Sequence, residues 1–331
     1  MKARPQLLAG LMAALLIAGC SSSTEQTRTL ATGQPIVASS GPIPHVVDSP
    51  ELQLPTTVTD AKGEQVTITD ASRIVSLSGG VTELLFALGL QDKVIGRDVT
   101  SDLPGAQDIP LVSQGHDINA EGVLALDPSL IIADTTTGPP ETIEALRKVG
   151  VPVLILPEVW SIKEALPRAR LLTDALGLSD AYPALADALG GKVEQLEKPL
   201  TIAFLYLRGT AAVYLMGGKG SGGDSVIEAM GGVDAGTKAG LEAFTPLTPE
   251  ALAASAPDVL LVMEKGLSSV GGVDGLLKLP GVAQTPAGKS RAVISVPDGE
   301  LLSFGPRTTG MLNGIAAQLN QMELSAPSSA S

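Results

Sequence analysis

The sequence predicts an α/β protein built from two similar lobes joined by a single long helix, with a ligand crevice between the lobes. Three observations support this fold class. Short apolar strands at residues 74–77, 130–133 and 153–156 alternate with amphipathic helices, which is typical of parallel α/β sheets. The same series of elements occurs again further along the chain, and a helix-forming segment separates the two occurrences.

An internal repeat indicates the two lobes. Residues 118–133 align with residues 247–262 at a constant offset of 129 residues. Each copy contains a polar helix cap, a glutamate two residues on, a short helix, a proline and an apolar strand. We therefore expect an N-terminal lobe at residues 55–160 and a C-terminal lobe at residues 199–324.

Residues 161–198 lie between the repeats and form the predicted connecting helical segment. A break is expected at Gly177, and residues 179–197 then form a helix of about 18 residues that spans roughly 27 Å. Such a rod suits two lobes that stand side by side. Small ligands bind preferentially between lobes, so the crevice is the expected binding site.

The first 19 residues are interpreted as a lipoprotein signal peptide. Lys2 and Arg4 precede an apolar run at residues 7–18, which is too short to span a bilayer. The following Leu-Ile-Ala-Gly-Cys, which ends at Cys20, resembles the lipobox of bacterial lipoproteins. This resemblance implies cleavage before Cys20, acylation of its sulfur and amine, and anchoring to the extracytoplasmic face of the cell membrane. A plain secretory signal followed by a chance cysteine is the alternative.

Polar stretches flank the predicted lobes on both sides. Residues 20–54 are rich in Ser, Thr, Pro, Gln and Gly, and we expect a flexible spacer there. Residues 325–331 are expected to be a disordered tail.

Composition argues against several classes of function. The 331 residues include 22 basic and 35 acidic side chains, a net charge of −13, so we expect no basic surface for nucleic acid. The single cysteine excludes a disulfide within the chain and a cysteine-rich metal site, and two histidines are too few for a three-histidine metal cage. The sequence shows no Ser-His-Asp grouping that would indicate nucleophilic catalysis.

Three segments resemble a known family of transport proteins. Residues 73–83, which read Arg-Ile-Val-Ser-Leu-Ser-Gly-Gly-Val-Thr-Glu, resemble the opening signature of the periplasmic-binding proteins that serve siderophore, cobalamin and haem ABC importers. The resemblance implies a monomeric binding protein, not an enzyme, that passes its ligand to a permease dimer and its ATPase. Residues 115–121 and 204–211 narrow the resemblance to the haem-binding, HmuT-like lipoproteins of Gram-positive bacteria.

The narrower resemblance implies a ligand set for haem b, the transported ligand. It implies that His116 from the first lobe and Tyr206 from the second are the axial ligands of the haem iron, with Arg208 beside the tyrosine. It also implies a methionine near the haem, and Met263 has the matching position. We expect Met263 to line the haem face rather than to bind the iron.

The chemistry of these residues is compatible with the implied roles. His116 follows Gly115 in a predicted loop and is the only histidine within the predicted lobes; imidazole binds haem iron well. Tyr206 and Arg208 point to the same face of a strand, so the guanidinium can stabilise a phenolate. Tyrosine has an ordinary pKa of about 10, which a metal and a neighbouring cation both lower. Tyr214 is a rival ligand, ranked lower because no basic residue lies two positions after it.

Glu83 and Glu228 are the predicted docking residues. Each lies in a predicted helix, one per lobe, and the resemblance implies that one acidic residue per lobe pairs with arginines of the permease. A solvated surface glutamate is the alternative for each.

Two further functions remain as alternatives. Cobalamin or a ferric siderophore would suit the same fold, but siderophore binders usually present several Arg and Trp side chains, and Trp160 is the only tryptophan. A chelatase-like or hydrolytic enzyme on a two-lobed fold would need an acid/base cluster, and the sequence shows none.

Overall fold

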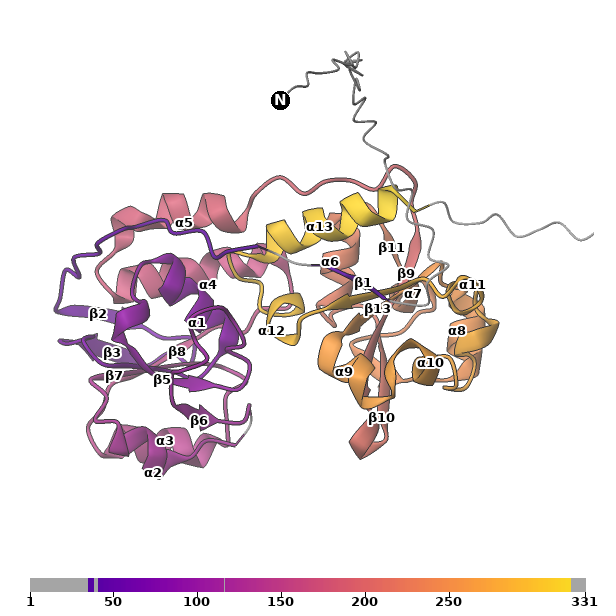
Figure 1. Cartoon of the computed structure of the whole chain (residues 1–331). Helices are drawn as coiled ribbons and strands as arrows, with labels where there is room; N and C mark the ends of the chain where they lie inside the picture. Colours follow the sequence, from indigo (N-terminus) through magenta and orange to yellow (C-terminus); the bar gives the residue numbers. More distant parts are fainter. Residues whose placement is uncertain (1–34, 39–40, 116, 323–331) are drawn as a thin grey trace, which may run out of the picture.

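The computed structural model describes residues 35–38, 41–115 and 117–322, which form two α/β lobes side by side (Figure 1). The lipidation candidate Cys20, the ligand candidate His116 and the predicted tail at 325–331 lie outside the described residues.

The N-terminal lobe contains a parallel sheet of five strands in the order β6-β5-β4-β7-β8. Its strands are β4 (Ile74–Ser76), β5 (Val94–Asp98), β6 (Leu111–Ser113), β7 (Leu130–Asp134) and β8 (Val153–Leu156). A separate antiparallel hairpin consists of β2 (Thr56–Thr59) and β3 (Gln65–Ile68). The helices are α1 (Gly79–Ala87), η2 (Gln91–Lys93), α2 (Ala120–Ala125) and α3 (Pro140–Lys148).

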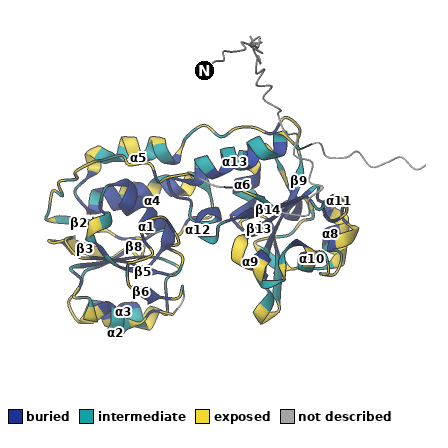
Figure 2. Ribbon diagram, in the orientation of Figure 1, coloured by how far each residue is buried: buried dark blue, intermediate teal, exposed yellow. Residues whose placement is uncertain are grey.

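This sheet is covered by helices on both faces, which explains why its strands are continuous apolar runs. Ile131 and Ile155 pack in one cluster with residues of α2 and α3. Ile132 and Leu154 point the other way and pack with α1. Figure 2 shows the strands and α1 as buried, whereas α3 carries an exposed outer face.

The C-terminal lobe contains a seven-stranded sheet in the order β1-β14-β13-β9-β10-β12, with β11 also paired to β9. Its strands are β1 (Ile36–Val37), β9 (Thr201–Arg208), β10 (Val213–Gly217), β11 (Val233–Asp234), β12 (Phe244–Pro246), β13 (Val259–Met263) and β14 (Val293–Val296). β13 runs parallel to both β9 and β14, and β10 is antiparallel to β9 and to β12. The helices are η4 (Gly209–Ala211), α6 (Gly223–Ala229), α7 (Ala235–Lys238), α8 (Pro249–Ser255), α9 (Glu264–Ser269), α10 (Gly272–Leu276), η5 (Val282–Gln284), α11 (Pro286–Ser290), α12 (Asp298–Leu301) and α13 (Thr308–Asn320).

The internal repeat has a direct structural counterpart. Asn119 caps α2 by accepting a hydrogen bond from the Gly122 N–H, and Thr248 caps α8 by accepting one from the Ala251 N–H. The strands that follow, β7 and β13, cover equivalent positions of the repeat. The prediction of two α/β lobes is therefore confirmed down to the helix caps.

The prediction of a helix over residues 179–197 is wrong. The connection begins with α4 (Ile162–Ala175), turns at Gly177 and η3 (Ser179–Ala181), and folds back in α5 (Tyr182–Leu189), which packs on α4. Two successive glycines, Gly190 and Gly191, follow α5, and helix propensity is low at such a pair. The chain then crosses to the C-terminal lobe without helical structure, along α13 (Figure 1).

Two asparagines of α13 hold this crossing segment. The Asn313 side chain accepts from the Glu194 N–H at 2.7 Å and donates to the Lys192 carbonyl at 3.3 Å. Asn320 repeats the arrangement: it accepts from the Glu197 N–H at 2.9 Å and donates to the Gln195 carbonyl at 3.1 Å. These bonds satisfy backbone groups that a helix would otherwise have paired.

The prediction of a flexible spacer at residues 20–54 is wrong for the part that the structure describes, residues 35–38 and 41–54. Ile36 and Val37 form β1 at the edge of the C-terminal sheet, parallel to β14. Further along, Ile43 is buried in the core and the Val46 N–H donates to the Ala87 carbonyl at 2.8 Å. The few apolar residues in this polar stretch are thus sufficient to attach it to both lobes.

None of the helices in the described ranges combines the length and the apolar character needed to cross a bilayer.

Candidate ligand-binding site

Two adjoining cavities lie in the crevice between the lobes. The larger one, the strand-end cavity, has a volume of about 570 Å³ and lies where β9 and β13 end. Its lining residues are Val99, Thr100, Asp102, Tyr206, Leu207, Arg208, Thr210, Ala211, Met263, Lys265, Gly266, Ser269, Asp298, Gly299 and Leu302. Both lobes thus contribute to it, and its volume is within the range of ligand pockets.

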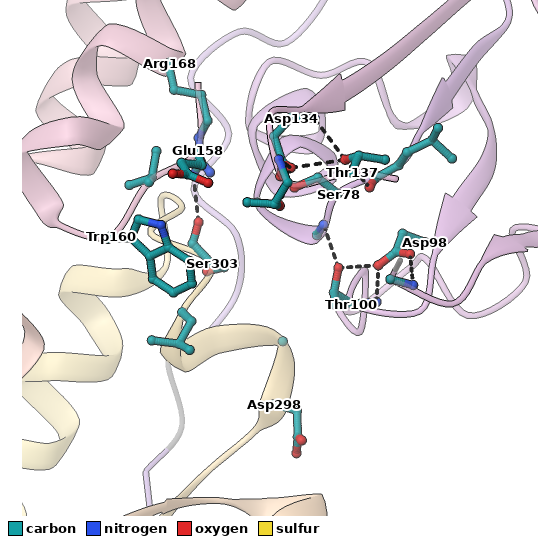
Figure 3. A pocket seen from close by; sticks show the side chains of 18 residues that line it. Ser78, Asp98, Thr100, Asp134, Thr137, Glu158, Trp160, Arg168, Asp298 and Ser303 are labelled. Carbon is teal, nitrogen blue, oxygen red and sulfur yellow. Dashed lines mark hydrogen bonds between the residues drawn. The ribbon is translucent and has the colours of Figure 1, made fainter. Parts of the chain in front are cut away.

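The smaller one, the hinge cavity, has a volume of about 250 Å³. Figure 3 shows Ser78, Thr100 and Asp134 of the N-terminal lobe facing Trp160 and Asp298 across it. The two cavities share Thr100, Asp298, Gly299 and Leu302, so they are parts of one crevice.

β9 brings two of the predicted site residues to the strand-end cavity. Tyr206 is half-buried, and its ring meets that of Phe244 edge-on, with the centroids 5.6 Å apart. Arg208, the last residue of β9, is exposed. Because alternate residues of a strand point to the same side, the phenol and the guanidinium lie on one face of the sheet. The structure thus brings the predicted tyrosine and its basic neighbour together at the cavity.

Met263 lies at the carboxyl end of β13, in the same cavity and nine-tenths buried. Its counterpart in the repeat, Asp134, ends β7 and lines the hinge cavity. Both lobes therefore present the ends of equivalent strands to the crevice, as ligand sites of parallel sheets generally do.

Tyr214, the rival ligand, lies on the other face of the sheet. Antiparallel pairing sets Tyr214 opposite Leu207 and sets Tyr206 opposite Leu215. Directly paired residues share a face, so the two tyrosines point to opposite sides. Tyr214 packs beside the C-terminal cluster that contains Leu205 and Leu207, and it does not line the strand-end cavity. The geometry favours Tyr206 as the tyrosine that meets a ligand.

The loop before position 116 starts at the hinge cavity. Gly115 lines this cavity, and its N–H donates to the Asp98 carboxylate at 2.7 Å. Asp98 is almost fully buried and also accepts from the N–H and the hydroxyl of Thr100, at 2.8 and 2.5 Å (Figure 3). One carboxylate at the end of β5 therefore fixes two strand-end loops beside the crevice.

Sequence reasoning missed an aromatic cluster at this site. Phe244 is at its centre, with the rings of Trp160 and Phe204 at centroid distances of 6.4 and 6.0 Å, in addition to Tyr206. Trp160 is 36% exposed and faces the hinge cavity (Figure 3). Half of the chain's eight aromatic residues gather here, but their spacing along the sequence gives no sign of it.

Arg168 is a buried cation that the sequence analysis also overlooked. It is on α4 and lines the hinge cavity, where its Nη2 donates to the carbonyls of Ser303 and Phe304 at 2.7 and 3.0 Å. Burial lowers the pKa of its guanidinium to about 10, while Asp134 and Glu83 act in the opposite direction. The group thus stays charged at neutral pH and joins α4 to the C-terminal segment.

The docking role predicted for Glu83 is wrong. Its carboxylate has no exposed surface and pairs with Arg307, so it cannot meet a permease arginine in this conformation. The sequence analysis assumed a surface helix, whereas every residue of α1 is buried. Glu228, its proposed counterpart on α6, is exposed.

A family comparison identifies the class of protein. The model of the family described as "Periplasmic binding protein" matches residues 74–299, from β4 to α12. The match covers more than half of the chain and includes both lobes. The chain therefore belongs to the periplasmic binding protein family, which consists of substrate-binding proteins and not of enzymes.

Solved structures extend this similarity to most of the chain. The heme binding protein HmuT is 35% identical with a TM-score of 0.80, and the match covers 87% of this chain and 98% of that one. The heme-binding protein RhuT from Roseiflexus sp. RS-1 is 40% identical with a TM-score of 0.72, covering 76% and 98%. HmuT variants in which a histidine, a tyrosine or the arginine two positions after that tyrosine is replaced by alanine also match.

Curated relatives match over shorter stretches. The ABC transporter substrate-binding lipoprotein YvrC of Bacillus subtilis is 28% identical over 210 residues, which is 61% of this chain and 61% of that relative. A vitamin B12-binding protein of Yersinia pestis is 38% identical over 84 residues, 25% of this chain and 30% of the relative.

Proposed function

We propose that this protein captures haem outside the cytoplasmic membrane and delivers it to an ABC transporter for haem and iron uptake. The observation that carries this proposal is the pairing of Tyr206 and Arg208 on one face of β9, where that strand ends in the strand-end cavity.

The chemistry of that pair suits ferric haem. A phenolate oxygen is a hard, anionic ligand that binds ferric iron, and a guanidinium beside it favours the deprotonated form. Phe244 holds the Tyr206 ring edge-on, so the oxygen has a defined position before a ligand arrives. The similarity to HmuT, whose studied variants include a tyrosine and the arginine two positions later, supports the same assignment.

The walls of the cavity suit a large, flat and mostly apolar ligand. Met263 and Leu302 contribute apolar surface, and the thioether of Met263 is polarisable. Tyr206 comes from the C-terminal lobe, and we assign the second axial position to His116 of the N-terminal lobe. Ligands from different lobes would make haem binding depend on the closure of the crevice.

We propose that the protein delivers haem to the transporter while it is anchored to the membrane. Acylated Cys20 would hold the lobes at the membrane, as the similarity to the lipoprotein YvrC supports, and exposed Glu228 remains the docking residue for the permease. Replacing Cys20 with alanine should release the protein from the membrane fraction and abolish lipid labelling. If the variant stayed in the membrane fraction and kept its lipid label, the proposed anchor at Cys20 would be refuted.

Titration of the purified protein with haemin tests the proposed ligand. We expect a saturable Soret band at one haem per chain and no binding of cyanocobalamin or a ferric siderophore at comparable concentration. The short match to vitamin B12-binding proteins makes cobalamin the second candidate. Binding of cobalamin or a siderophore without haemin would overturn the proposal.

A further inference from the structure

A lysine of the C-terminal lobe reaches across the crevice to the N-terminal lobe. Lys265 is on the first turn of α9, two residues after Met263. Its Nζ lies 2.7 Å from Oδ2 of Asp102, which belongs to the loop after β5. Both residues line the strand-end cavity, so this ion pair stands at the wall of the proposed binding site.

A hydrogen bond to its backbone fixes the position of Lys265. The Lys265 N–H donates to Oδ2 of Asp298 at 2.8 Å, and Asp298 also lines the cavity. The carboxylate of Asp298 therefore holds the first turn of α9 in place. The side chain beyond it is 63% exposed and consists of a flexible four-carbon stem, which can move its charge to a new partner.

The strand-end cavity contains one cation that has no role yet in binding the ligand. Among the described residues that line the strand-end cavity, Arg208 and Lys265 carry positive charge, and Asp102 and Asp298 carry negative charge. Arg208 lies on the same strand face as the Tyr206 phenol, which it is proposed to stabilise. Lys265 is the cation that remains for an anionic substituent of the ligand.

We propose that Lys265 binds a carboxylate of the ligand and leaves Asp102 to do so. This inference rests on the proposed function, because haem carries two carboxylates on its propionate arms. An exposed ion pair contributes little to stability, so breaking the pair between Lys265 and Asp102 costs little free energy. A carboxylate that enters the cavity offers the ammonium a charge-assisted hydrogen bond in place of the one that it makes to Asp102.

The protonation state of Lys265 agrees with this role. Its hydrogen bond to Asp102 raises the pKa of the ammonium above its ordinary value of 10.5, with further contributions from the charges of Asp102, Asp298 and Glu264. The side chain is therefore a cation throughout the neutral range and needs no proton uptake when it changes partner.

A comparison of two ligands on two proteins tests the proposal. Haemin and haemin dimethyl ester, whose carboxylates are blocked, would be titrated into the purified full chain and into the Lys265→Met variant. We expect Lys265→Met to weaken haemin binding by about tenfold, the size of one charged hydrogen bond, and to leave ester binding unchanged. The matched control Lys278→Met changes an exposed lysine outside the cavity and should alter neither affinity.

Removal of the competing carboxylate gives a result of opposite sign. Asp102→Asn frees Lys265 and should tighten haemin binding, but only while the lysine is present; the same change in the Lys265→Met background should have a smaller effect. If the ion pair were only a latch between the lobes, Asp102→Asn would leave haemin binding unchanged or weaken it.

The outcomes separate this inference from the proposed function. If the unaltered protein binds haemin and Lys265→Met changes its affinity equally for haemin and ester, or for neither, the role of Lys265 is overturned and haem binding stands. If the unaltered protein binds neither ligand, the proposed function fails and this inference fails with it.

Discussion

Glu83 and Arg307 form a buried ion pair that joins α1 of the N-terminal lobe to the chain just before α13. Nη2 of Arg307 lies 3.2 Å from Oε2 of Glu83, and the Arg307 N–H donates to Oε1 at 2.6 Å. Nη1 of the same guanidinium contacts Glu300 on α12 at 2.9 Å. A buried charge network of this kind is stable only when all of its members are present.

We predict that Glu83→Ala strongly destabilises the protein. The change removes one of the two carboxylates that pair with the buried guanidinium of Arg307, and breaking a buried ion pair in this way costs about 3–5 kcal/mol of free energy of unfolding. Denaturant unfolding of the variant and of the parent protein measures the difference. Glu228→Ala is the matched control at an exposed position of α6 and should stay within about 0.5 kcal/mol. Equal stability of the two variants would contradict the buried pairing.

The same carboxyl group predicts a pH dependence. Burial raises the pKa of Glu83 above its ordinary value of 4.5, although Arg307 opposes this shift. The folded state then binds the proton more tightly than the unfolded state, so the stability that this group contributes is complete below 4.5 and is lost as pH rises through the folded pKa. Relative to Glu83→Gln, which does not titrate, the parent protein should lose stability as the pH is raised from about 4 to about 8. A difference in free energy of unfolding that grows with pH would contradict the raised pKa.

We predict that Arg208 tunes the haem iron without binding it. Arg208→Ala should retain haem while its ferric charge-transfer band shifts and its reduction potential rises, because the phenolate loses a stabilising cation. Arg208→Lys should restore part of the effect, since an ammonium lacks the planar fork of donors. Spectroelectrochemical titration measures the potentials. An Arg208→Ala protein with the potential of the parent would show that the arginine has no such role.

Trp160 provides a direct optical report of where the ligand binds. It is the only tryptophan, and its ring faces the hinge cavity beside the aromatic cluster. Haem in the adjoining strand-end cavity should quench its fluorescence in proportion to the Soret change, with the same endpoint. A Soret titration that reaches saturation while Trp160 emission stays constant would place the haem elsewhere.

Much of the architecture was predictable because its signals are local. The polar caps at Asn119 and Thr248 and the apolar runs after them specify equivalent elements through neighbours along the chain. Tyr206 and Arg208 were identified through the family resemblance of residues 204–211, and alternation along a strand predicted their shared face.

The incorrect predictions concern residues whose contact partners are far away in the sequence. Glu83 has the pattern of a surface glutamate, and only Arg307, 224 residues later, explains its burial. The crossing segment is not helical, and its backbone N–H groups donate instead to Asn313 and Asn320, each more than 100 residues away. The aromatic cluster around Phe244 likewise joins residues that are far apart in the sequence, with Trp160 packing against Phe244 from outside the C-terminal lobe.

The central claim is that Tyr206, and not Tyr214, binds ferric iron, and resonance Raman spectroscopy of the haem-loaded protein tests it most directly. Tyr206→Phe removes the phenol at the strand-end cavity, and Tyr214→Phe removes the one on the opposite face of the sheet. We predict that the tyrosinate bands of the parent protein disappear in Tyr206→Phe and persist in Tyr214→Phe. Tyrosinate bands that survive in Tyr206→Phe, or that vanish in Tyr214→Phe, would contradict the account.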